Sequence, residues 1–355
     1  MTLKPWLPRV AANAGLVPRQ TVPQPVDPAQ AKALLDMLGA SGVVKRLLAG
    51  ASNATEYFLV EQPGDLPNLF VKIVEGHHAE RQIAADAIAR FVTTGGVGVS
   101  HLEDGFPRQL DDGRNVLAYN FVDGRLVADA KDAAFASDMA CLGEAIGRLH
   151  VRLSEWPDAS SVRRQSEQRR HRLDKQLRRV LDGEPIPGPV PGLVKRLVER
   201  YPDAFSQCAI DAQTIHGDLN PGNVLFDSLD KPILLDFEEA VSAWYAPLVE
   251  LTYVLERFVW ARVENDDLAL EVAGKFVASY VAATGASLAV RTGALQETVE
   301  WLALRSCILM IESHEHGTVW PDTEWQKFEA LVSLAQTRRP LLEAIEGVFT
   351  MNGLD

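Results

Sequence analysis

The segment TIHGDLNPGNVLFDSLDKPILLDFEEA, residues 214–240, constrains the fold and the chemistry of this chain more than any other stretch. It contains two short apolar runs, residues 224–226 and 233–235, which are separated by a polar turn. Two β-prone runs joined by such a turn predict a β-hairpin. Because a hairpin brings its two open ends together, polar residues just before the first strand and just after the second are expected to meet.

Three polar side chains stand at these open ends. Asp218 and Asn223 precede the first strand, and Asp236 follows the second. Asp236 and Asn223 offer the hard oxygen ligands that suit Mg²⁺, which binds through few carboxylates together with substrate phosphates. Asp218 is placed to accept a hydroxyl proton. The spacing H-x-D-x-x-x-x-N followed by D-F-x is that of a kinase catalytic loop and predicts metal-assisted phosphoryl transfer.

The alternative interpretation of this segment is an ordinary polar hairpin in which Asp and Asn merely form turns. Several linked spacings fit the catalytic pattern at once, and this argues against the alternative.

The strings HGDLNPGN and LLDFE resemble the aminoglycoside phosphotransferase and choline kinase family, whose members are relatives of the protein kinases. Gly217 fits this family, because most protein kinases have Arg at the corresponding position. Glu238 stands where a protein kinase has Gly, and no A-P-E motif follows Phe237. These last two departures argue against a protein kinase with a phosphorylatable activation loop.

The resemblance implies an α+β, two-lobed, protein-kinase-like fold. Its small N-terminal lobe has an antiparallel sheet and one helix, and its larger C-terminal lobe is mainly helical. We expect a Pro-rich arm over residues 1–27, a nucleotide-binding lobe over 28–122 and a catalytic and acceptor-binding lobe over 123–355. A short helix is predicted to begin at Asp27-Pro28, with Asp27 as its N-cap.

Composition argues against several classes of protein. The net charge of −13 argues against nucleic acid as a partner. No apolar run approaches the roughly 18 residues of a membrane span, and the proline-broken N-terminal stretch lacks the apolar region of a secretory signal. Cys141, Cys208 and Cys307 are widely spaced, which argues against a disulfide framework or a zinc site and favours a cytoplasmic protein.

Lys72 lies inside the apolar run 70–74, and an ammonium in such a run needs a partner. Glu80, on a helix predicted over about 77–91, is the favoured candidate, and Glu75 is also near. A Lys–Glu pair of this kind would aim the ammonium at the α- and β-phosphates of a nucleotide. The alternative is an edge-strand Lys that points to solvent.

Two further segments are assigned to the nucleotide, ATP or GTP. Residues 49–55 are small and polar, so backbone N–H groups near Ser52 and Asn53 can approach phosphate oxygens. In the resembling family this loop covers the nucleotide phosphates; a plain hairpin loop is the alternative. The family's hinge matches residues 117–124, where the backbone of Asn120 and Val122 is expected to bond the adenine edge.

The large lobe carries features whose roles the sequence leaves open. His150, at the end of a predicted helix, is interpreted as a packed structural histidine. Glu250 is the acid nearest to the position where the resembling family has an Asp that braces the catalytic loop, and whether it takes that role is open. Residues 163–179 are strongly basic, either to attract an anionic substrate or, as we favour, as a helix face paired with acids elsewhere.

The acceptor is not identified by spacing alone. A cationic acceptor would be suited, through charge and cation–π contacts, by a set of acids and aromatic residues: Glu238, Glu239, Glu312, Glu315, Trp244, Tyr245 and Trp260. The same aromatic residues can equally belong to the core, and the basic segment favours an anionic acceptor instead.

The sequence therefore predicts a kinase that transfers the γ-phosphoryl of ATP or GTP to a hydroxyl of a small acceptor of the aminoglycoside, choline or homoserine class. Asp218 is the expected base, Asn223 and Asp236 the expected Mg²⁺ ligands, and Lys72 the expected phosphate ligand. Two alternatives are a nucleotide-binding pseudokinase regulator and a nucleotidyl transferase on the same scaffold.

Overall fold

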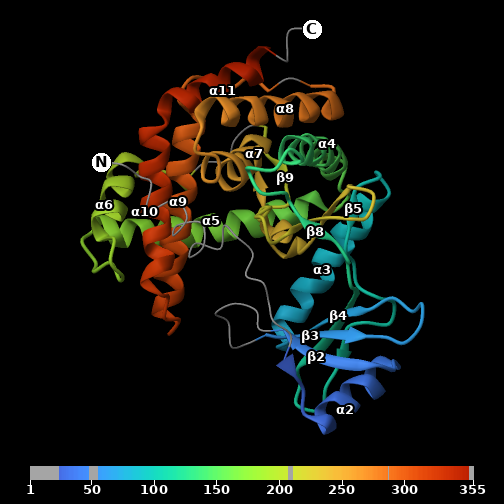
Figure 1. The fold of residues 1–355 in the computed structure, drawn as a ribbon. Coiled ribbons are helices and arrows are strands. Elements are labelled where there is room, and N and C mark those ends of the chain that lie inside the picture. Colours follow the sequence, from blue (N-terminus) through green and yellow to red (C-terminus); the bar gives the residue numbers. More distant parts are fainter. Residues whose placement is uncertain (1–23, 48–54, 207–210, 287, 352–355) are drawn as a thin grey trace.

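The chain folds into a small lobe built on a sheet and a larger lobe built mainly of helices (Figure 1). The computed structural model describes residues 24–47, 55–206, 211–286 and 288–351. The expected α+β, two-lobed architecture is confirmed. No helix among these residues combines the length and the apolar character that crossing a bilayer requires.

The small lobe is organised around a six-stranded antiparallel sheet. Its strand order is β1 (Gln24–Pro25), β2 (Val43–Leu47), β3 (Glu56–Glu61), β4 (Leu69–Val74), β7 (Asn115–Asn120) and β6 (Arg108–Gln109). Side chains along a strand point alternately to the two faces of the sheet. Strand β4 is apolar on both of its faces, apart from Lys72. The sheet therefore places this lysine in the centre of the lobe, between β3 and β7, and not at an edge.

Two helices accompany this sheet, where the resemblance implied one. Helix α3 (Gly76–Thr93) directly follows β4 and lies toward the large lobe. Helix α2 (Pro28–Leu38) begins as predicted at Asp27, whose carboxylate accepts hydrogen bonds from the backbone N–H groups of Ala29 and Gln30 at 3.0 and 3.1 Å. It ends at Gly39 in the left-handed conformation.

The predicted hairpin is present at the centre of a second, four-stranded sheet. Strands β10 (Val224–Phe226) and β11 (Pro232–Leu234) pair antiparallel, with Val224 opposite Leu234. The sheet is completed by β8 (Arg125–Leu126) beside β10 and by β5 (Gly98–Val99) parallel to β11.

Strand β5 comes from the part of the sequence that was expected to belong wholly to the small lobe. Its approach to β11 requires Gly98, because a Cβ atom there would lie only 2.8 Å from the carbonyl oxygen of Pro232. Residues of the small lobe thus enter the sheet that carries the β10–β11 hairpin.

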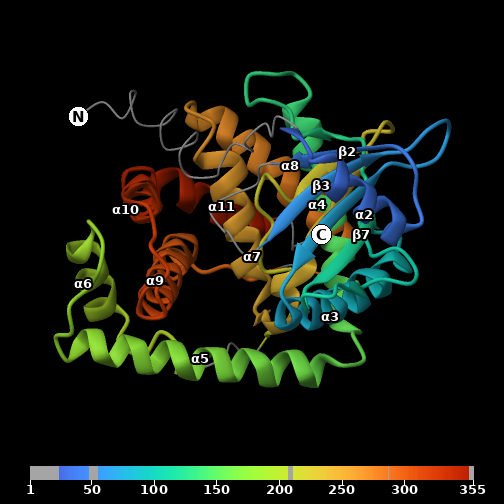
Figure 2. The ribbon, with the colours of Figure 1, turned by 90° about the horizontal axis from the view of Figure 1, so that it is seen from below.

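Helices form the rest of the large lobe, and Figure 2 shows α5 lying across one side with α6, α9 and α10 beside it. The main elements after β8 are α4 (Phe135–Ser154), α5 (Ala159–Leu181), α6 (Pro191–Arg200), β9 (Gln213–Thr214), the 3-10 turn Phe237–Ser242, β12 (Trp244–Tyr245), α7 (Pro247–Val254), a π-helical turn Leu255–Trp260, α8 (Asp266–Thr284), α9 (Ala294–Glu315), α10 (Asp322–Thr337) and α11 (Arg339–Met351).

Helices α4 and α8 pack unusually closely in the core of the large lobe. Gly143 of α4 makes this possible, because a Cβ atom at this position would lie 2.2 Å from the carbonyl oxygen of Phe276 on α8. Gly274, in the middle of α8, has no such neighbour, since nothing lies within 4 Å of a Cβ placed there. A methyl group would therefore clash at Gly143 and would fit at Gly274, although both glycines lie inside helices.

We expect Gly143→Ala to lower the free energy of unfolding by about 1–3 kcal/mol or more, because the added methyl group overpacks a backbone contact. Gly274→Ala is the matched control and should raise stability by about 0.5–1 kcal/mol, since alanine has the higher helix propensity. Thermal and urea unfolding of both variants measure the difference. A Gly143→Ala variant as stable as the wild type would contradict this description of the α4–α8 contact.

Candidate active site

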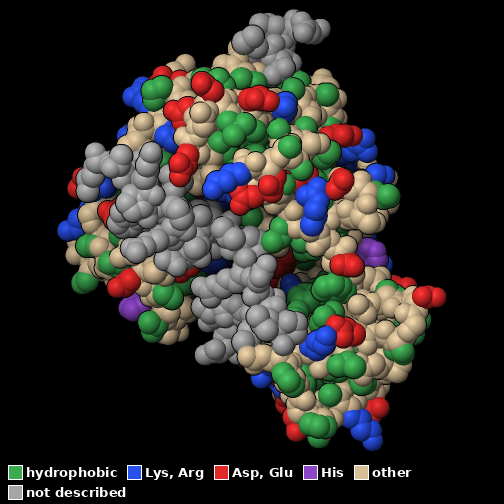
Figure 3. All heavy atoms as spheres, viewed as in Figure 1, with side chains coloured by type: hydrophobic (Ala, Val, Ile, Leu, Met, Phe, Trp, Pro, Cys, Tyr) green, Lys and Arg blue, Asp and Glu red, His purple; other side chains and the backbone are tan. Residues whose placement is uncertain are grey.

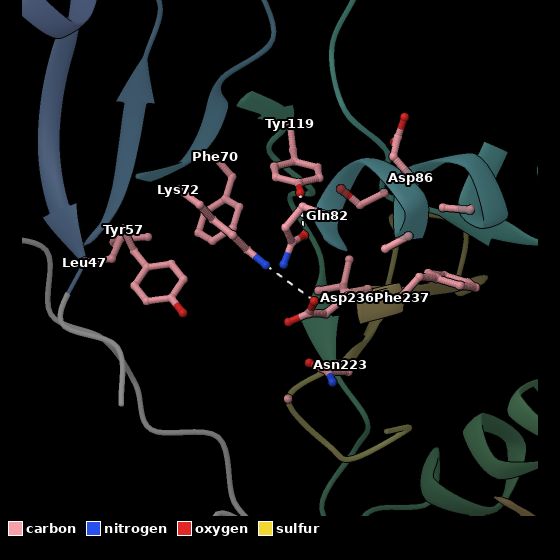
Figure 4. Close-up of a pocket in the computed structure, with 15 residues that line it drawn as sticks. Leu47, Tyr57, Phe70, Lys72, Gln82, Asp86, Tyr119, Asn223, Asp236 and Phe237 are labelled. Carbon is pink, nitrogen blue, oxygen red and sulfur yellow. Dashed lines mark hydrogen bonds and ion pairs between the residues drawn. The ribbon is translucent and has the colours of Figure 1, made fainter. Parts of the chain in front are cut away.

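A cavity of about 330 Å³ lies between the two lobes. Figure 3 shows the surface hollowed where the small lobe meets the large one, and Figure 4 shows the side chains that line the cavity. The small lobe contributes Lys72 from β4 and residues of α3, and the large lobe contributes Asn223 and Asp236 from the two ends of the hairpin. The structure thus brings together three of the residues that the sequence singled out.

Lys72 points into this cavity from the buried strand β4. Its Nζ lies 3.5 Å from Asp236 Oδ1 and 5.7 Å from the centre of the Tyr119 ring, and its side chain is only 10% exposed. The expected partner, Glu80, does not fill this role in the structure, since its side chain is exposed. The reason is the phase of the helix, because α3 turns Gln82, Ala85, Asp86 and Ala89 toward the cavity, and Glu80 lies on another face.

Gln82, and not Glu80, is the polar side chain near the start of α3 that lines the cavity, although it contacts residues other than Lys72. Its Oε1 accepts a hydrogen bond of 2.9 Å from the Tyr119 hydroxyl, and its Nε2 donates one of 2.7 Å to Glu238 Oε2. Neither Gln82 nor Tyr119 carries a motif signal in the sequence. The only available signal is position: Gln82 lies on the face of α3 that lines the cavity, and Tyr119 lies near the end of β7.

Asp236 occupies a strained backbone conformation directly after β11. Its φ and ψ angles are 61° and 71°, in the left-handed region that residues other than glycine seldom adopt. Such strain is typical of functional positions. The backbone N–H of Leu235 donates to the carbonyl of Asn223 at 2.9 Å, so the two ends of the hairpin are held side by side.

Asn223 is oriented by the residue expected to be the base. Its Nδ2 donates to the backbone carbonyl of Asp218 at 2.8 Å and to Asp218 Oδ2 at 3.1 Å, which leaves its side-chain oxygen as the atom available to a cation. One carboxylate and one amide oxygen in a phosphate-sized cleft match the sparse protein ligation that Mg²⁺ uses. Among the residues that the structure describes, no cluster of three or more His, Cys, Asp or Glu competes for such an ion.

Asp218 is half-buried and held by hydrogen bonds on both carboxylate oxygens. The hydroxyl of Tyr253 donates to Oδ1 at 2.9 Å, and Asn220 Nδ2 donates to Oδ2 at 3.1 Å. Burial raises the pKa of Asp218 above its ordinary value and outweighs the opposing effect of the bonds from Asn220 and Tyr253. Tyr253 was not found from the sequence, because it lies on α7, far along the chain from the catalytic loop.

Glu250 braces the loop that carries Asp218. Its carboxylate accepts hydrogen bonds from the backbone N–H groups of His216, at 3.2 Å, and Gly217, at 2.5 Å. It also contacts His150 Nε2 at 2.8 Å, and His150 Nδ1 lies 3.0 Å from the Tyr280 hydroxyl. Glu250 thus makes the bracing contacts that the sequence analysis left open, and His150 is a buried structural residue.

The electrostatics of Glu250 follow from these contacts. Burial by itself would raise its pKa, but the hydrogen bond and charge of His150, the charge of His216 and the N–H of Gly217 outweigh burial, and the pKa of Glu250 lies below its ordinary value. The ring of His216 bonds to the carbonyl of Leu235 at 3.0 Å, so the same loop is also tied to the end of β11.

Four expected nucleotide contacts have different outcomes in the structure. Ser52 and Asn53 lie outside the described residues. Asn120 ends β7 opposite Leu69 with an exposed side chain, and Val122 follows it in the connection between the lobes. Neither Asn120 nor Val122 lines the cavity described above, and their backbone contact with a nucleotide base stays a prediction.

The basic segment forms most of α5, and its side chains are largely paired with acids of the same or neighbouring elements, as we favoured. The recorded pairs join Arg163 to Glu167, Arg169 to Glu239, Arg172 to Glu312, Arg178 to Asp174, and Arg179 to Glu184 and Glu315. Glu239, Glu312 and Glu315, which were considered for a cationic acceptor, are therefore engaged with this helix. Trp260 is fully buried, so it belongs to the core and not to a ligand site.

A second cavity, of about 480 Å³, borders Asp218 on the side of α9 and α10. Asp218 does not line the cavity that contains Lys72, whereas Gly217, Asp218 and Asn220 line this second one. The loop from Gly217 to Asn223 therefore separates two hollows, with Asn223 lining the first and Asp218 lining the second.

Comparison with solved structures shows the fold. Choline kinase LicA from Streptococcus pneumoniae matches with a TM-score of 0.56 at 13% identity, over 87% of this chain and 98% of that one. Spectinomycin phosphotransferase APH(9)-Ia, in complex with ADP and spectinomycin, matches with a TM-score of 0.57 at 13% identity, over 91% and 99%. The GDP and kanamycin complex of APH(2")-IIia matches with a TM-score of 0.56 at 16% identity, over 88% and 99%.

The sequence itself gives the family. No curated protein matches the chain closely enough to name a relative. The model of the phosphotransferase enzyme family, however, matches residues 43–291, well over half of the chain, and this span includes Lys72, the catalytic hairpin and Glu250. The chain belongs to the phosphotransferase enzyme family.

Proposed function

We propose that the protein is a small-molecule kinase that transfers the γ-phosphoryl of ATP or GTP to a hydroxyl of a small acceptor. The observation that carries this proposal is the placement of Asp218 and Asn223 on one loop between two cavities. The cavity with Lys72 and Asp236 would hold the nucleotide, and the cavity that begins at Asp218 would hold the acceptor. The solved neighbours bound to ADP or GDP support a nucleotide in this fold.

On the nucleotide side, each residue has a distinct role. Lys72, buried and facing the cavity, would bind the α- and β-phosphates through its ammonium. Asp236 and Asn223 would hold Mg²⁺, which when bound neutralises charge on the phosphate oxygens. The hydrogen bonds of Asn223 to Asp218 keep its side-chain oxygen directed away from the base and free for this purpose.

On the acceptor side, Asp218 would orient the hydroxyl and take its proton as the bond to phosphorus forms. Burial raises the pKa of Asp218, which makes its carboxylate a stronger base than that of an ordinary aspartate. The hydroxyl of Tyr253 bonds to Oδ1 and fixes the plane of the carboxylate. Most of the catalytic effect would come from positioning and from charge neutralisation.

Asp218→Asn should lower kcat by about 10²–10⁴-fold, the usual contribution of a general base, and leave nucleotide affinity nearly unchanged. Turnover is measured as ADP release with an acceptor found by screening hydroxyl compounds with ATP and Mg²⁺, and the product mass separates a phosphate adduct from a nucleotide adduct. Because Asp218 must be ionised, wild-type turnover should fall as pH drops through its raised pKa.

The control is Asp227→Asn, which alters a carboxylate in the turn of the same hairpin whose Oδ1 accepts from the backbone of Leu229 and Lys231. It should retain turnover. Undiminished phosphate transfer in Asp218→Asn would rule out the assignment of the base.

Asp236→Asn and Lys72→Met should affect nucleotide binding in different ways. Without the Asp236 carboxylate, Mg²⁺ should no longer strengthen binding, whereas loss of the Lys72 ammonium should weaken binding both with and without the metal. Isothermal titration of each variant with ATP in the presence and absence of Mg²⁺ makes the comparison. A full metal effect in Asp236→Asn would contradict its role as a ligand.

Glu250→Gln should lower stability at neutral pH, because the amide cannot satisfy His216, Gly217 and His150 as the carboxylate does. The pKa of Glu250 is depressed in the folded protein, so its contribution is complete above its ordinary pKa of 4.5 and is lost as pH falls below that value. Urea unfolding should therefore show a gap between wild type and variant at pH 7 that narrows at pH 4.

Glu144→Gln, at a half-exposed site paired with Arg148 on α4, is the control for this prediction and should differ from the wild type by less than about 1 kcal/mol at both pH values. A Glu250→Gln gap that stays constant or widens on acidification would show that the bracing carboxylate is not ionised.

A further inference from the structure

The cavity beside Asp218 continues away from the catalytic loop into an open hollow of about 530 Å³. The two share Arg169, Glu324 and Lys327 in their walls. Helices α5, α9 and α10 and the π-helical turn after α7 supply this surface, and Figure 2 shows the first three of these helices grouped beside one another. We refer to the combined space as the acceptor groove.

The carboxylates of the acceptor groove are already neutralised by cations of the protein. Glu256 lies 3.1 Å from Arg257, Glu324 lies 2.5 Å from Lys327 and Glu312 lies 3.2 Å from Arg172. Glu239 contacts several guanidinium groups. Among the described residues that line the groove, Asp218 is the carboxylate without an ion pair, and it accepts hydrogen bonds from neutral groups instead.

Three guanidinium groups contact the carboxylate of Glu239 where the groove meets the segment after Asp236, and one of them, Arg81, also pairs with Glu238. Glu239 lies 2.6 Å from Arg169, 2.7 Å from Arg81 and 3.3 Å from Arg305. Although burial opposes ionisation, these three positive charges lower the pKa of Glu239 to about 2. The pKa of Arg169 is lowered first by burial and then by the charge of Arg305, while Glu239 acts in the opposite direction.

One of the groove's guanidinium groups also has a donor without a partner. Arg305 Nε is buried and makes no hydrogen bond within the described part of the chain, whereas Arg257 Nε, which also makes none, lies 3.1 Å from Glu256 Oε2 in their ion pair. Their side chains are 13% and 8% exposed. Arg257 lies in the π-helical turn, an irregularity that is frequent at functional sites. An unpaired buried donor is unfavourable unless a ligand satisfies it.

We propose that the acceptor is an alcohol that also carries an oxyanion, either a phosphate or a carboxylate. The oxyanion would be bound by Arg305 and Arg257 while the hydroxyl faces Asp218. This inference rests on the proposed function and names the chemical class of its second substrate. Guanidinium groups suit this task, because their planar donors match the oxygens of phosphate and carboxylate.

In the transfer itself, the acceptor oxygen forms a bond to the γ-phosphorus, and the bond between that phosphorus and the β–γ bridging oxygen breaks. The nucleoside diphosphate leaves with the electron pair, and the hydroxyl proton passes to Asp218. The oxyanion of the acceptor takes no part in the bond changes. Its role is to fix the distance between the hydroxyl and the base.

A polycationic acceptor does not fit this groove. Apart from Asp218, the carboxylates of the groove are already paired, so additional ammonium groups would have to displace Arg169, Arg257 or Lys327 from them. The aromatic contact considered for a cation is also engaged, since Arg305 lies 5.7 Å from the centre of the buried Tyr245 ring. The choice that the sequence left open between a cationic and an anionic acceptor therefore falls on the anionic class.

The test is calorimetric titration of the full chain saturated with ADP and Mg²⁺, so that the nucleotide site is occupied. The probes are sn-glycerol 3-phosphate, D-glycerate, glycerol, choline and kanamycin. At least one of the two anions should bind about 10-fold or more tightly than glycerol, choline and kanamycin, as expected for charge-assisted hydrogen bonds, and their ranking separates phosphate from carboxylate. Equal or tighter binding of glycerol, choline or kanamycin would overturn the proposal.

Substitutions locate the site. Arg305→Gln should weaken the preferred anion about 10-fold or more, and Arg305→Lys should recover part of the loss because it keeps the charge. Arg178→Gln removes an exposed arginine of α5 outside the groove and should bind as the wild type does. Melting curves verify that each variant is folded. Wild-type anion affinity in folded Arg305→Gln would overturn the assignment.

The two proposals fail in different ways. Anion binding in the groove without phosphate transfer to any hydroxyl compound would remove the kinase function and leave the anion site in place. Phosphate transfer to choline, kanamycin or neutral alcohols in preference to their anionic counterparts would remove the anionic acceptor and leave the kinase function in place.

Discussion

One buried carboxylate, that of Glu250, holds the backbone on which the candidate active site is built. Backbone N–H groups at 216 and 217 would otherwise be buried without acceptors, and an unpaired buried amide is unfavourable by about 1–3 kcal/mol. Gly217 is required in this loop, because its φ is +86° and a Cβ atom would lie 2.8 Å from Ala243 Cβ. With this turn fixed, Asp218 faces one cavity and Asn223 the other. Glu250 lies on α7, and its carboxylate is also contacted by His150 Nε2 at 2.8 Å.

The small lobe is joined to this arrangement through charge. Arg81 of α3 donates to the backbone carbonyl of Glu238 at 3.0 Å and contacts the Glu239 carboxylate, while Gln82 contacts Glu238. The helix that follows the Lys72 strand is therefore tied to the turn that follows Asp236. The position of the ammonium relative to the candidate metal ligands depends on these side-chain contacts as well as on the strands themselves.

The hairpin could be predicted from sequence because its signals are local: two apolar runs, a polar turn and fixed spacings. Lys72 could be found for the same reason, since a lone charge stands out in an apolar strand. The pairing with Glu80 was not formed because helical phase, and not distance along the chain, decides which side chain of α3 meets the cavity. Tyr253 could not be found, because its contact with Asp218 depends on how α7 packs, and no local pattern encodes this.

The charge balance of the acceptor groove also lay beyond the sequence. Counting residues in 163–179 suggested a basic surface, yet most of those cations are paired with acids from the same or neighbouring elements. The feature that the sequence does not reveal lies around Glu239, whose single carboxylate is contacted by Arg81, Arg169 and Arg305 from three separate helices. Only the packing of α3, α5 and α9 brings those three guanidinium groups together.

The entry of β5 into the sheet of the large lobe has a mechanical consequence. After α3 the chain enters the sheet of the large lobe as β5, Gly98–Val99, which pairs with β11 of the hairpin. It then returns to the small lobe for β6 and β7. It enters the same sheet of the large lobe a second time as β8, Arg125–Leu126, at the opposite edge. The lobes are thus attached at two separated points instead of by a single tether. Free twisting of one lobe against the other would have to break the pairing of β5 with β11 or of β8 with β10.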